Sequence, residues 1–274
     1  MKIFTFLFHL LLTNTQSYIF SKPCNIYKKK YNDKIIKVFE PTNIDKKNLD
    51  SLLFFTGGNS LIPADIYTCF ISSLVDYKYS VSVLPNDLQA SYEYIKDIQN
   101  NYSSITPIAH SSGCVNAINT INNFYNIKKS IFLDPVDNSK LFNIFNNIKY
   151  EKLFYLKDLL IITAEKSYQW SLAPICFPFI PAFRLDIMKL LNLKSDLNIQ
   201  YIEAEQHGHC DILDPMWADI MHETISKGHY NRTYANLYSY HNWLAQQIHN
   251  FIYYDENDSN YTPYTLEQRA DDSY

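Results

Sequence analysis

The sequence predicts an α/β fold in which a mostly parallel central sheet carries helices on both faces. Short apolar runs alternate with stretches of helical periodicity along most of the 274 residues, a pattern typical of parallel strands joined by helical crossovers. The central apolar runs are rich in β-branched residues at successive positions, as expected for strands covered on both sides. No internal repeat is found, and the length suits one large domain.

The expected elements follow one another in chain order. Strands are expected at 35–39, 51–56, 79–84, 104–109, 130–134, 158–164 and 199–204. Helices are expected near 64–76, 87–100, 112–125, 139–148, 183–193, 213–226 and 234–252. The apolar stretch 170–183 departs from the pattern, because Pro174, Pro178 and Pro181 prevent a regular helix or a central strand there. This insert is either packing or a wall of the substrate site.

The two ends of the chain read differently from the domain at 18–254. Residues 1–17 combine an early cation, Lys2, with the apolar run Ile3–Leu12 and small polar residues, which is typical of a secretory signal peptide. The alternative is a buried N-terminal strand. The acidic, polar tail 255–274 is expected to be disordered. A secreted or lumenal glycoprotein is therefore expected, in agreement with glycosylation sequons at Asn101, Asn231, Asn257 and Asn260.

Composition excludes some partners. The formal charge of −4 argues against nucleic acid, and the basic run 28–30 is expected to be a solvated loop. Five cysteines permit at most two disulfides and leave one thiol over. We expect a small apolar substrate, with transient contact to lipid or a membrane surface allowed, and no cofactor. The oligomeric state stays open.

The segment IAHSSGC (108–114) predicts a catalytic serine. An apolar strand, a tight turn and a helix follow one another, and the turn has the form small-x-Ser-x-Gly of a nucleophile elbow. The strained serine requires small neighbours two positions away on each side, and Ala109 and Gly113 supply them. Ser111 is therefore the predicted nucleophile, and the backbone N–H of Ser112 at the helix start is a predicted oxyanion donor.

A serine nucleophile needs a base and an acid that orients it. His209 is the predicted base, because it follows a strand in a short loop and Gly208 permits a sharp turn before it. Asp134, at the end of the strand after the nucleophile, is the predicted acid, with Glu165 and Asp137 as alternatives. His207, His209 and Asp211 also resemble a metal-binding pattern, but Ile stands at 212 where a further ligand is expected, so no metal is predicted.

The second oxyanion donor is expected in the loop after the strand at 51–56. Gly57 and Gly58 allow backbone N–H groups to approach a ligand closely, and Gly58 is the first choice with Asn59 second. Residues beside these segments and in the apolar insert are expected to contact the substrate. They are Asn59 and His110 beside the segments, and Cys176, Phe177 and Phe179 in the insert.

With these residues assigned, the chain resembles the chlorophyllase family of the α/β-hydrolases over roughly residues 50–250. The matching pieces are FFTGGN (54–59), AHSSGC (109–114), LDPVDN (133–138), APICFP (173–178) and HGHCDILD (207–214), in the family's order. The resemblance places Ser111, Asp134 and His209 at the family's triad positions and implies hydrolysis of a lipid-like ester. Thr56 stands where many relatives have His, and Ser112 where the elbow has Arg.

The function predicted from the sequence is that of a serine carboxylesterase acting on an apolar ester through an acyl-enzyme. Two alternatives stay open. One is a hydrolase fold retained as a non-catalytic binding protein, and the other is an acyltransferase that passes the acyl group to an alcohol.

Overall fold

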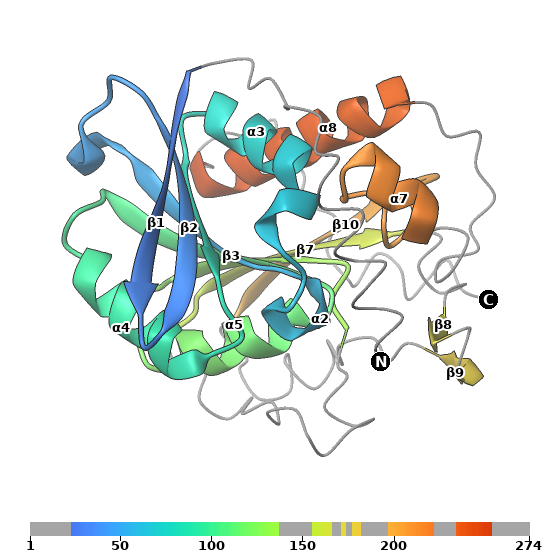
Figure 1. Ribbon diagram of the computed structural model, residues 1–274, viewed down its shortest axis with the longest axis horizontal. Helices are drawn as coiled ribbons and strands as arrows, with labels where there is room; N and C mark the ends of the chain where they lie inside the picture. Colours follow the sequence, from blue (N-terminus) through green and yellow to red (C-terminus); the bar gives the residue numbers. More distant parts are fainter. Residues whose placement is uncertain are drawn as a thin grey trace.

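A computed structural model describes residues 23–136, 155–165, 171–173, 177–181, 197–221 and 234–253. In this part of the chain, eight strands form one sheet with the order β1-β2-β4-β3-β5-β6-β7-β10 (Figure 1). The strands are β1 Cys24–Tyr31, β2 Lys34–Pro41, β3 Asp50–Phe55, β4 Ser80–Leu84, β5 Ser104–His110, β6 Lys129–Leu133, β7 Asp158–Ala164 and β10 Asn198–Ala204. β1 pairs with β2, and β2 with β4, in antiparallel fashion. The remaining neighbours in the sheet, β4-β3-β5-β6-β7-β10, pair in parallel. The predicted mostly parallel sheet is confirmed.

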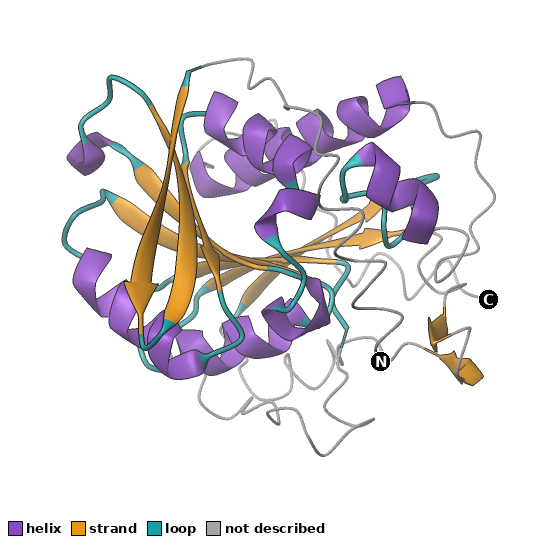
Figure 2. Cartoon of the chain, in the orientation of Figure 1, coloured by secondary structure: helices purple, strands orange, loops and turns teal. Residues whose placement is uncertain are grey.

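Helices cover both faces of this sheet (Figure 2). They are α2 Gly57–Ser60, α3 Thr68–Asp76, α4 Leu88–Ile98, α5 Gly113–Ile121, α7 Pro215–Met221 and α8 Tyr234–Tyr253, with short 3-10 turns η2 Lys46–Asn48 and η3 Ala64–Ile66. α3, α7 and α8 pack on one face, and α4 and α5 on the other. α4 begins where the Asp87 carboxylate accepts a hydrogen bond of 2.8 Å from the Ala90 N–H, a standard N-cap.

The core is divided by the sheet into two clusters. In β3, Leu52 and Phe54 point to the cluster under α3 and α8, while Leu53 and Phe55 point to the cluster under α4 and α5. All four side chains are fully buried, which is the reason that β3 reads as a continuous apolar run rather than an alternating one.

The strand order places the loops after β3 and β5 next to each other. β3 lies between β4 and β5, and α3, the longer helix after β3, lies on the opposite face of the sheet from α5, which follows β5. Such a reversal of strand order opens a crevice at the carboxyl edge of a parallel sheet, where ligands bind. The loop with Gly57 and the turn with Ser111 therefore meet at this edge.

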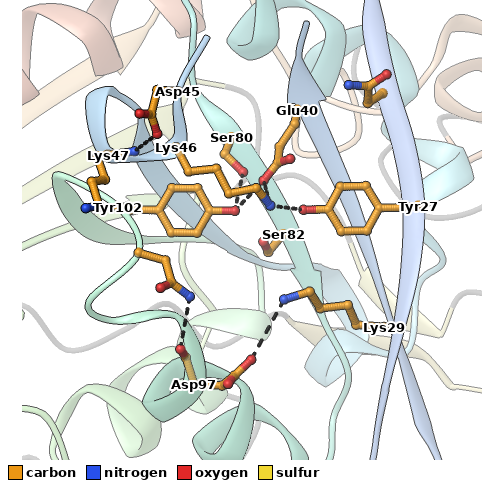
Figure 3. Close-up of polar contacts among 12 residues, drawn as sticks. Tyr27, Lys29, Glu40, Asp45, Lys46, Lys47, Ser80, Ser82, Asp97 and Tyr102 are labelled. Carbon is orange, nitrogen blue, oxygen red and sulfur yellow. Dashed lines mark hydrogen bonds and ion pairs between the residues drawn. The ribbon is translucent and has the colours of Figure 1, made fainter. Parts of the chain in front are cut away.

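The opposite, amino edge of the sheet holds a second polar network, which we call the Glu40 cluster: Tyr27, Glu40, Lys46, Ser80 and Tyr102 (Figure 3). The Tyr102 hydroxyl donates to the Glu40 carboxylate, and the Lys46 ammonium lies 2.9 Å from a Glu40 oxygen. The same ammonium donates to the Tyr27 hydroxyl at 2.9 Å. This cluster ties the β1–β2 hairpin to the starts of β4 and β5.

Two expectations differ from the structure. The basic run 28–30 lies within β1, an edge strand whose residues alternate in exposure, and not in a loop. Three successive lysines mask the alternation in the sequence, and lysine on an edge strand opposes pairing with another chain. The insert holds a short antiparallel pair outside the main sheet, β8 Ser171–Ala173 and β9 Phe177–Pro181, in a stretch where no strand was predicted.

Several expectations concern residues outside the described ranges. They are the leader 1–17, the helices near 139–148 and 183–193, and the tail 255–274. In the described ranges, no helix is long and apolar enough to cross a membrane. Cys24, Cys69, Cys114 and Cys210, the cysteines in those ranges, are not joined to one another by disulfides.

Candidate active site

The tight turn predicted for the nucleophile elbow forms between β5 and α5. Ser111 has φ of +56°, in the left-handed region that a non-glycine residue adopts only under constraint. Its N–H donates to the Leu133 carbonyl at 3.0 Å, and its own carbonyl accepts from the Cys114 N–H at 3.2 Å. The backbone on both sides thus holds the serine in this conformation.

Gly113 shows why the elbow needs a small residue at that position. A Cβ atom built on Gly113 would lie 2.4 Å from the carbonyl oxygens of Phe55 and Thr56. The start of α5 therefore packs directly against the backbone that leaves β3. This contact brings the elbow and the loop of Gly57 and Gly58 together.

Three side chains selected from the sequence form one hydrogen-bonded line. The Ser111 Oγ lies 2.9 Å from His209 Nε2, and His209 Nδ1 is hydrogen-bonded to Asp134 Oδ2. Ser111, Asp134 and His209 are 6%, 7% and 5% exposed. In this arrangement the imidazole can accept the serine proton at Nε2 while Nδ1–H donates to the carboxylate.

Asp134 is fixed independently of the histidine. It follows β6 with φ of +43°, its N–H donates to the Ile162 carbonyl at 2.6 Å, and its Oδ1 accepts from the Ala164 N–H at 3.2 Å. The second oxygen is therefore aimed at His209. Glu165, the alternative acid, instead accepts from the Gln206 N–H at 2.6 Å and anchors the turn after β10. Asp137 lies outside the described residues.

The histidine loop (205–211) is closed by its own hydrogen bonds. Asp211 Oδ2 accepts from the Gly208 N–H at 2.8 Å, and the Asp211 N–H donates to the Gly208 carbonyl at 3.1 Å. His207 stacks on Tyr240 with ring centroids 3.8 Å apart and lies 3.5 Å from Asp211 Oδ2. His207 and His209 therefore face different partners. Among the described residues, no group of three or more His, Cys, Asp or Glu side chains is arranged to hold a metal ion.

His110 does not occupy the substrate-facing position expected of it. The side chain is 3% exposed, and its two nitrogens contact protein atoms: Nδ1 lies 2.9 Å from the Tyr67 hydroxyl and Nε2 lies 3.0 Å from the His209 carbonyl oxygen. Burial, with a smaller effect of the neighbouring His209, lowers the pKa of His110 to about 3, so the ring is neutral. It sits in the interior because β5 directs it beneath the elbow.

Tyr67 has no signal in the sequence that would separate it from the other 22 tyrosines. It is fully buried at the start of α3, and its hydroxyl accepts from the Gly57 N–H at 3.0 Å. Since that N–H is committed to Tyr67, an oxyanion donor in this loop has to come from a later residue.

The expected oxyanion donors lie in the two segments that meet. Gly58 is exposed with φ of +62°, and Ser112 is the N-cap of α5. The side chains of Asn59, Cys176, Phe177 and Phe179 fall outside what the structure describes, so their substrate contacts stay predictions.

No protein-family model and no curated protein sequence matches the chain. Solved structures do. An esterase domain from Rhodothermus marinus aligns with a TM-score of 0.53 at 8% identity, covering 84% of this chain and 100% of that one. A protein from Staphylococcus aureus described as a putative esterase aligns with a TM-score of 0.53 at 10% identity, covering 90% and 92%. A fungal esterase from Rhizomucor miehei aligns with a TM-score of 0.51 at 11% identity, covering 89% and 87%.

The chain has the α/β-hydrolase fold. Identities this low carry the fold alone, so function has to be argued from the site itself.

Proposed function

We propose that this protein is a serine hydrolase that cleaves an apolar carboxylic ester through an acyl-enzyme. The observation that carries the proposal is the line from Ser111 Oγ to His209 Nε2 at 2.9 Å, continued by His209 Nδ1 to Asp134. A hydroxyl, a base and an orienting carboxylate in this order can deprotonate a serine for attack on a carbonyl.

The geometry supports the following reaction. His209 Nε2 takes the proton of Ser111 as Oγ bonds to the ester carbon, and the carbonyl oxygen becomes an oxyanion held by the N–H groups of Ser112 and Gly58. Asp134 stabilises the imidazolium. His209 then gives the proton to the leaving alcohol as the C–O bond breaks, which leaves the acyl group on Ser111. Water then attacks the acyl carbon while His209 takes a proton from it. The bond to Ser111 Oγ breaks, His209 returns the proton to Oγ, and the acyl group leaves as the carboxylic acid.

The substrate class rests on separate support. The structural neighbours are described as esterases. The resemblance to chlorophyllases points to an ester of a long apolar alcohol, and the apolar insert 170–183 would supply the wall of its pocket. Export through the secretory pathway belongs to the same proposal, and Asn101, exposed after α4, is a described sequon that could carry a glycan.

A fluorophosphonate probe tests the proposal. We expect the full chain to be labelled on the peptide containing Ser111 and to hydrolyse p-nitrophenyl esters, with a preference among acyl chain lengths. Ser111→Ala should lose labelling and about 10³-fold or more in kcat. Ser130→Ala is the matched control, because Ser130 is a buried serine in β6 whose hydroxyl bonds to the Pro107 carbonyl.

A folded wild-type chain that neither reacts with the probe nor turns over any ester would contradict the proposal and favour a binding protein. Turnover that rises with added alcohol and yields a new ester would identify an acyltransferase instead.

A further inference from the structure

Beneath the proposed triad, a chain of hydrogen bonds joins three segments that are far apart in the sequence. The Gly57 N–H donates to the Tyr67 hydroxyl at 3.0 Å, that hydroxyl lies 2.9 Å from His110 Nδ1, and His110 Nε2 lies 3.0 Å from the His209 carbonyl oxygen. The chain therefore links the loop of Gly57, the elbow and the histidine loop.

With His110 neutral, only one assignment of hydrogens satisfies all three contacts. The Gly57 N–H can only donate, so the Tyr67 oxygen accepts there and its one proton is available to His110. His110 Nδ1 then accepts, Nε2 carries the ring hydrogen, and this hydrogen donates to the His209 carbonyl. A carbonyl oxygen can only accept, so the chain ends consistently.

Burial stabilises this series of hydrogen bonds. Tyr67 is fully buried and His110 nearly so, and their rings pack edge to face with centroids 5.7 Å apart. The His110 ring also lies over that of His209 at 4.8 Å. A buried donor or acceptor that loses its partner costs about 1–3 kcal/mol, so the three contacts support one another.

The space beside Gly57 is limited by this series of hydrogen-bonded side chains. A Cβ atom there would lie 3.0 Å from the Tyr67 hydroxyl and 3.3 Å from His110 Nδ1. The hydroxyl and the imidazole, together with the Ile62 side chain at 3.1 Å, crowd the space that a side chain on residue 57 would need.

We propose that Tyr67 and His110 are positioning residues that hold the oxyanion loop (56–60) and the histidine loop against the nucleophile elbow. The inference rests on the proposed function. Tyr67 fixes the N–H of Gly57, the residue before Gly58, and His110 fixes the backbone carbonyl of His209 from the position next to Ser111. Donors and base are then in place before the oxyanion forms, which is the condition for electrostatic stabilisation without rearrangement.

The test is Tyr67→Phe in the full chain, which removes only the hydroxyl. We expect kcat to fall about 10- to 100-fold with little change in KM, since a misplaced catalytic group costs rate rather than ground-state binding. The affinity of an alkyl boronic acid, which forms a tetrahedral adduct on the serine, should weaken by the same factor as kcat/KM.

The matched control is Tyr94→Phe. Tyr94 is another fully buried tyrosine, and its hydroxyl bonds to Ser82 at 2.5 Å on the opposite face of the sheet. This variant should lose stability but keep the wild-type kcat and boronate affinity. Equal losses of activity in both variants, or no loss in folded Tyr67→Phe, would overturn the inference.

A measurement on the wild type covers the case in which Tyr67→Phe does not fold. Nitrogen NMR of histidine-labelled protein should show His110 with a hydrogen on Nε2 and a bare Nδ1 throughout pH 5–9. A hydrogen on Nδ1 would contradict the hydrogen bond from the Tyr67 hydroxyl to His110 and overturn the inference. This measurement does not depend on enzyme activity. An inactive wild type would contradict the proposed function, while the NMR result would still test the hydrogen bonds of His110.

Discussion

The amino and carboxyl edges of the main sheet each bury a carboxylate, and the two carboxylates have different partners. At the amino edge, Glu40 receives hydrogen bonds from Tyr102 and Lys46 (Figure 3). Burial opposes its ionisation, but the bonds from Tyr102, Lys46 and Tyr27 outweigh burial and lower the pKa of Glu40. At the carboxyl edge, Asp134 meets His209, which in turn contacts Ser111.

The two edges also differ in which residues have positive φ. Four non-glycine residues at the carboxyl edge have positive φ: Ser60 at 63°, Ser111 at 56°, Asp134 at 43° and Gln206 at 59°. Two residues near the amino edge also have positive φ, Asn43 at 64° in the turn after β2 and Lys78 at 67° after the end of α3, and left-handed backbone is ordinary at both kinds of position. At the carboxyl edge, positive φ falls on two residues of the proposed triad, Ser111 and Asp134, while the Glu40 cluster has the character of a stabilising contact.

The largest expected effect that would sharpen this contrast is that of Asp134→Asn. An amide cannot hold the Nδ1–H tautomer of His209 as a carboxylate does, so Nε2 would no longer be free to accept the serine proton. We expect kcat for ester hydrolysis to fall about 10³- to 10⁴-fold, with a small change in thermal unfolding. A folded variant that keeps a tenth of the wild-type kcat would show that Asp134 is not the orienting acid.

A smaller effect, this time on folding, is expected for Gly113→Ala. The added methyl group would meet two backbone carbonyl oxygens, which cannot rotate away as a side chain would. We expect the free energy of unfolding, measured in urea, to drop by about 2–4 kcal/mol. The rate of fluorophosphonate labelling should fall as well, because the oxyanion loop must move away from the elbow. Unchanged stability would mean that the contact is looser than the structure shows.

The smallest effect is expected at the amino edge, from Glu40→Gln. At pH 7 the free energy of unfolding of the variant should be about 1–2 kcal/mol lower than that of the wild type, because a charged acceptor for Lys46 and Tyr102 is lost. The kcat for ester hydrolysis should stay at the wild-type value. The pKa of Glu40 is lower in the folded chain, so its contribution is complete above the unfolded pKa and disappears as pH falls through the folded one.

The stability difference between Glu40→Gln and wild type should therefore narrow on acidification below about pH 4.5. Chemical unfolding at several pH values measures it. A difference that widens in acid, or a fall in kcat at neutral pH, would break the contrast between the two edges.

Short-range patterns in the sequence were sufficient for the parallel strands, for the crossover helices within the described ranges and for the tight turn at Ser111. Ala109 and Gly113 mark a turn that only small residues allow, and Gly208 marks the loop before His209. These are local steric requirements, so they are visible within a few residues of one another. The selection of Ser111, Asp134 and His209 depended on such turns at the ends of strands.

The tertiary structure decided what lies beneath those turns. It placed His110 in the interior, gave Glu165 to the turn at Gln206, and made Lys28–Lys30 part of an edge strand. The contact of Tyr67 with His110 spans 43 positions, and that of His110 with His209 spans 99. Partners this distant leave no periodic or local mark, because a buried hydroxyl or imidazole is determined by which groups the folded sheet brings within hydrogen-bond distance.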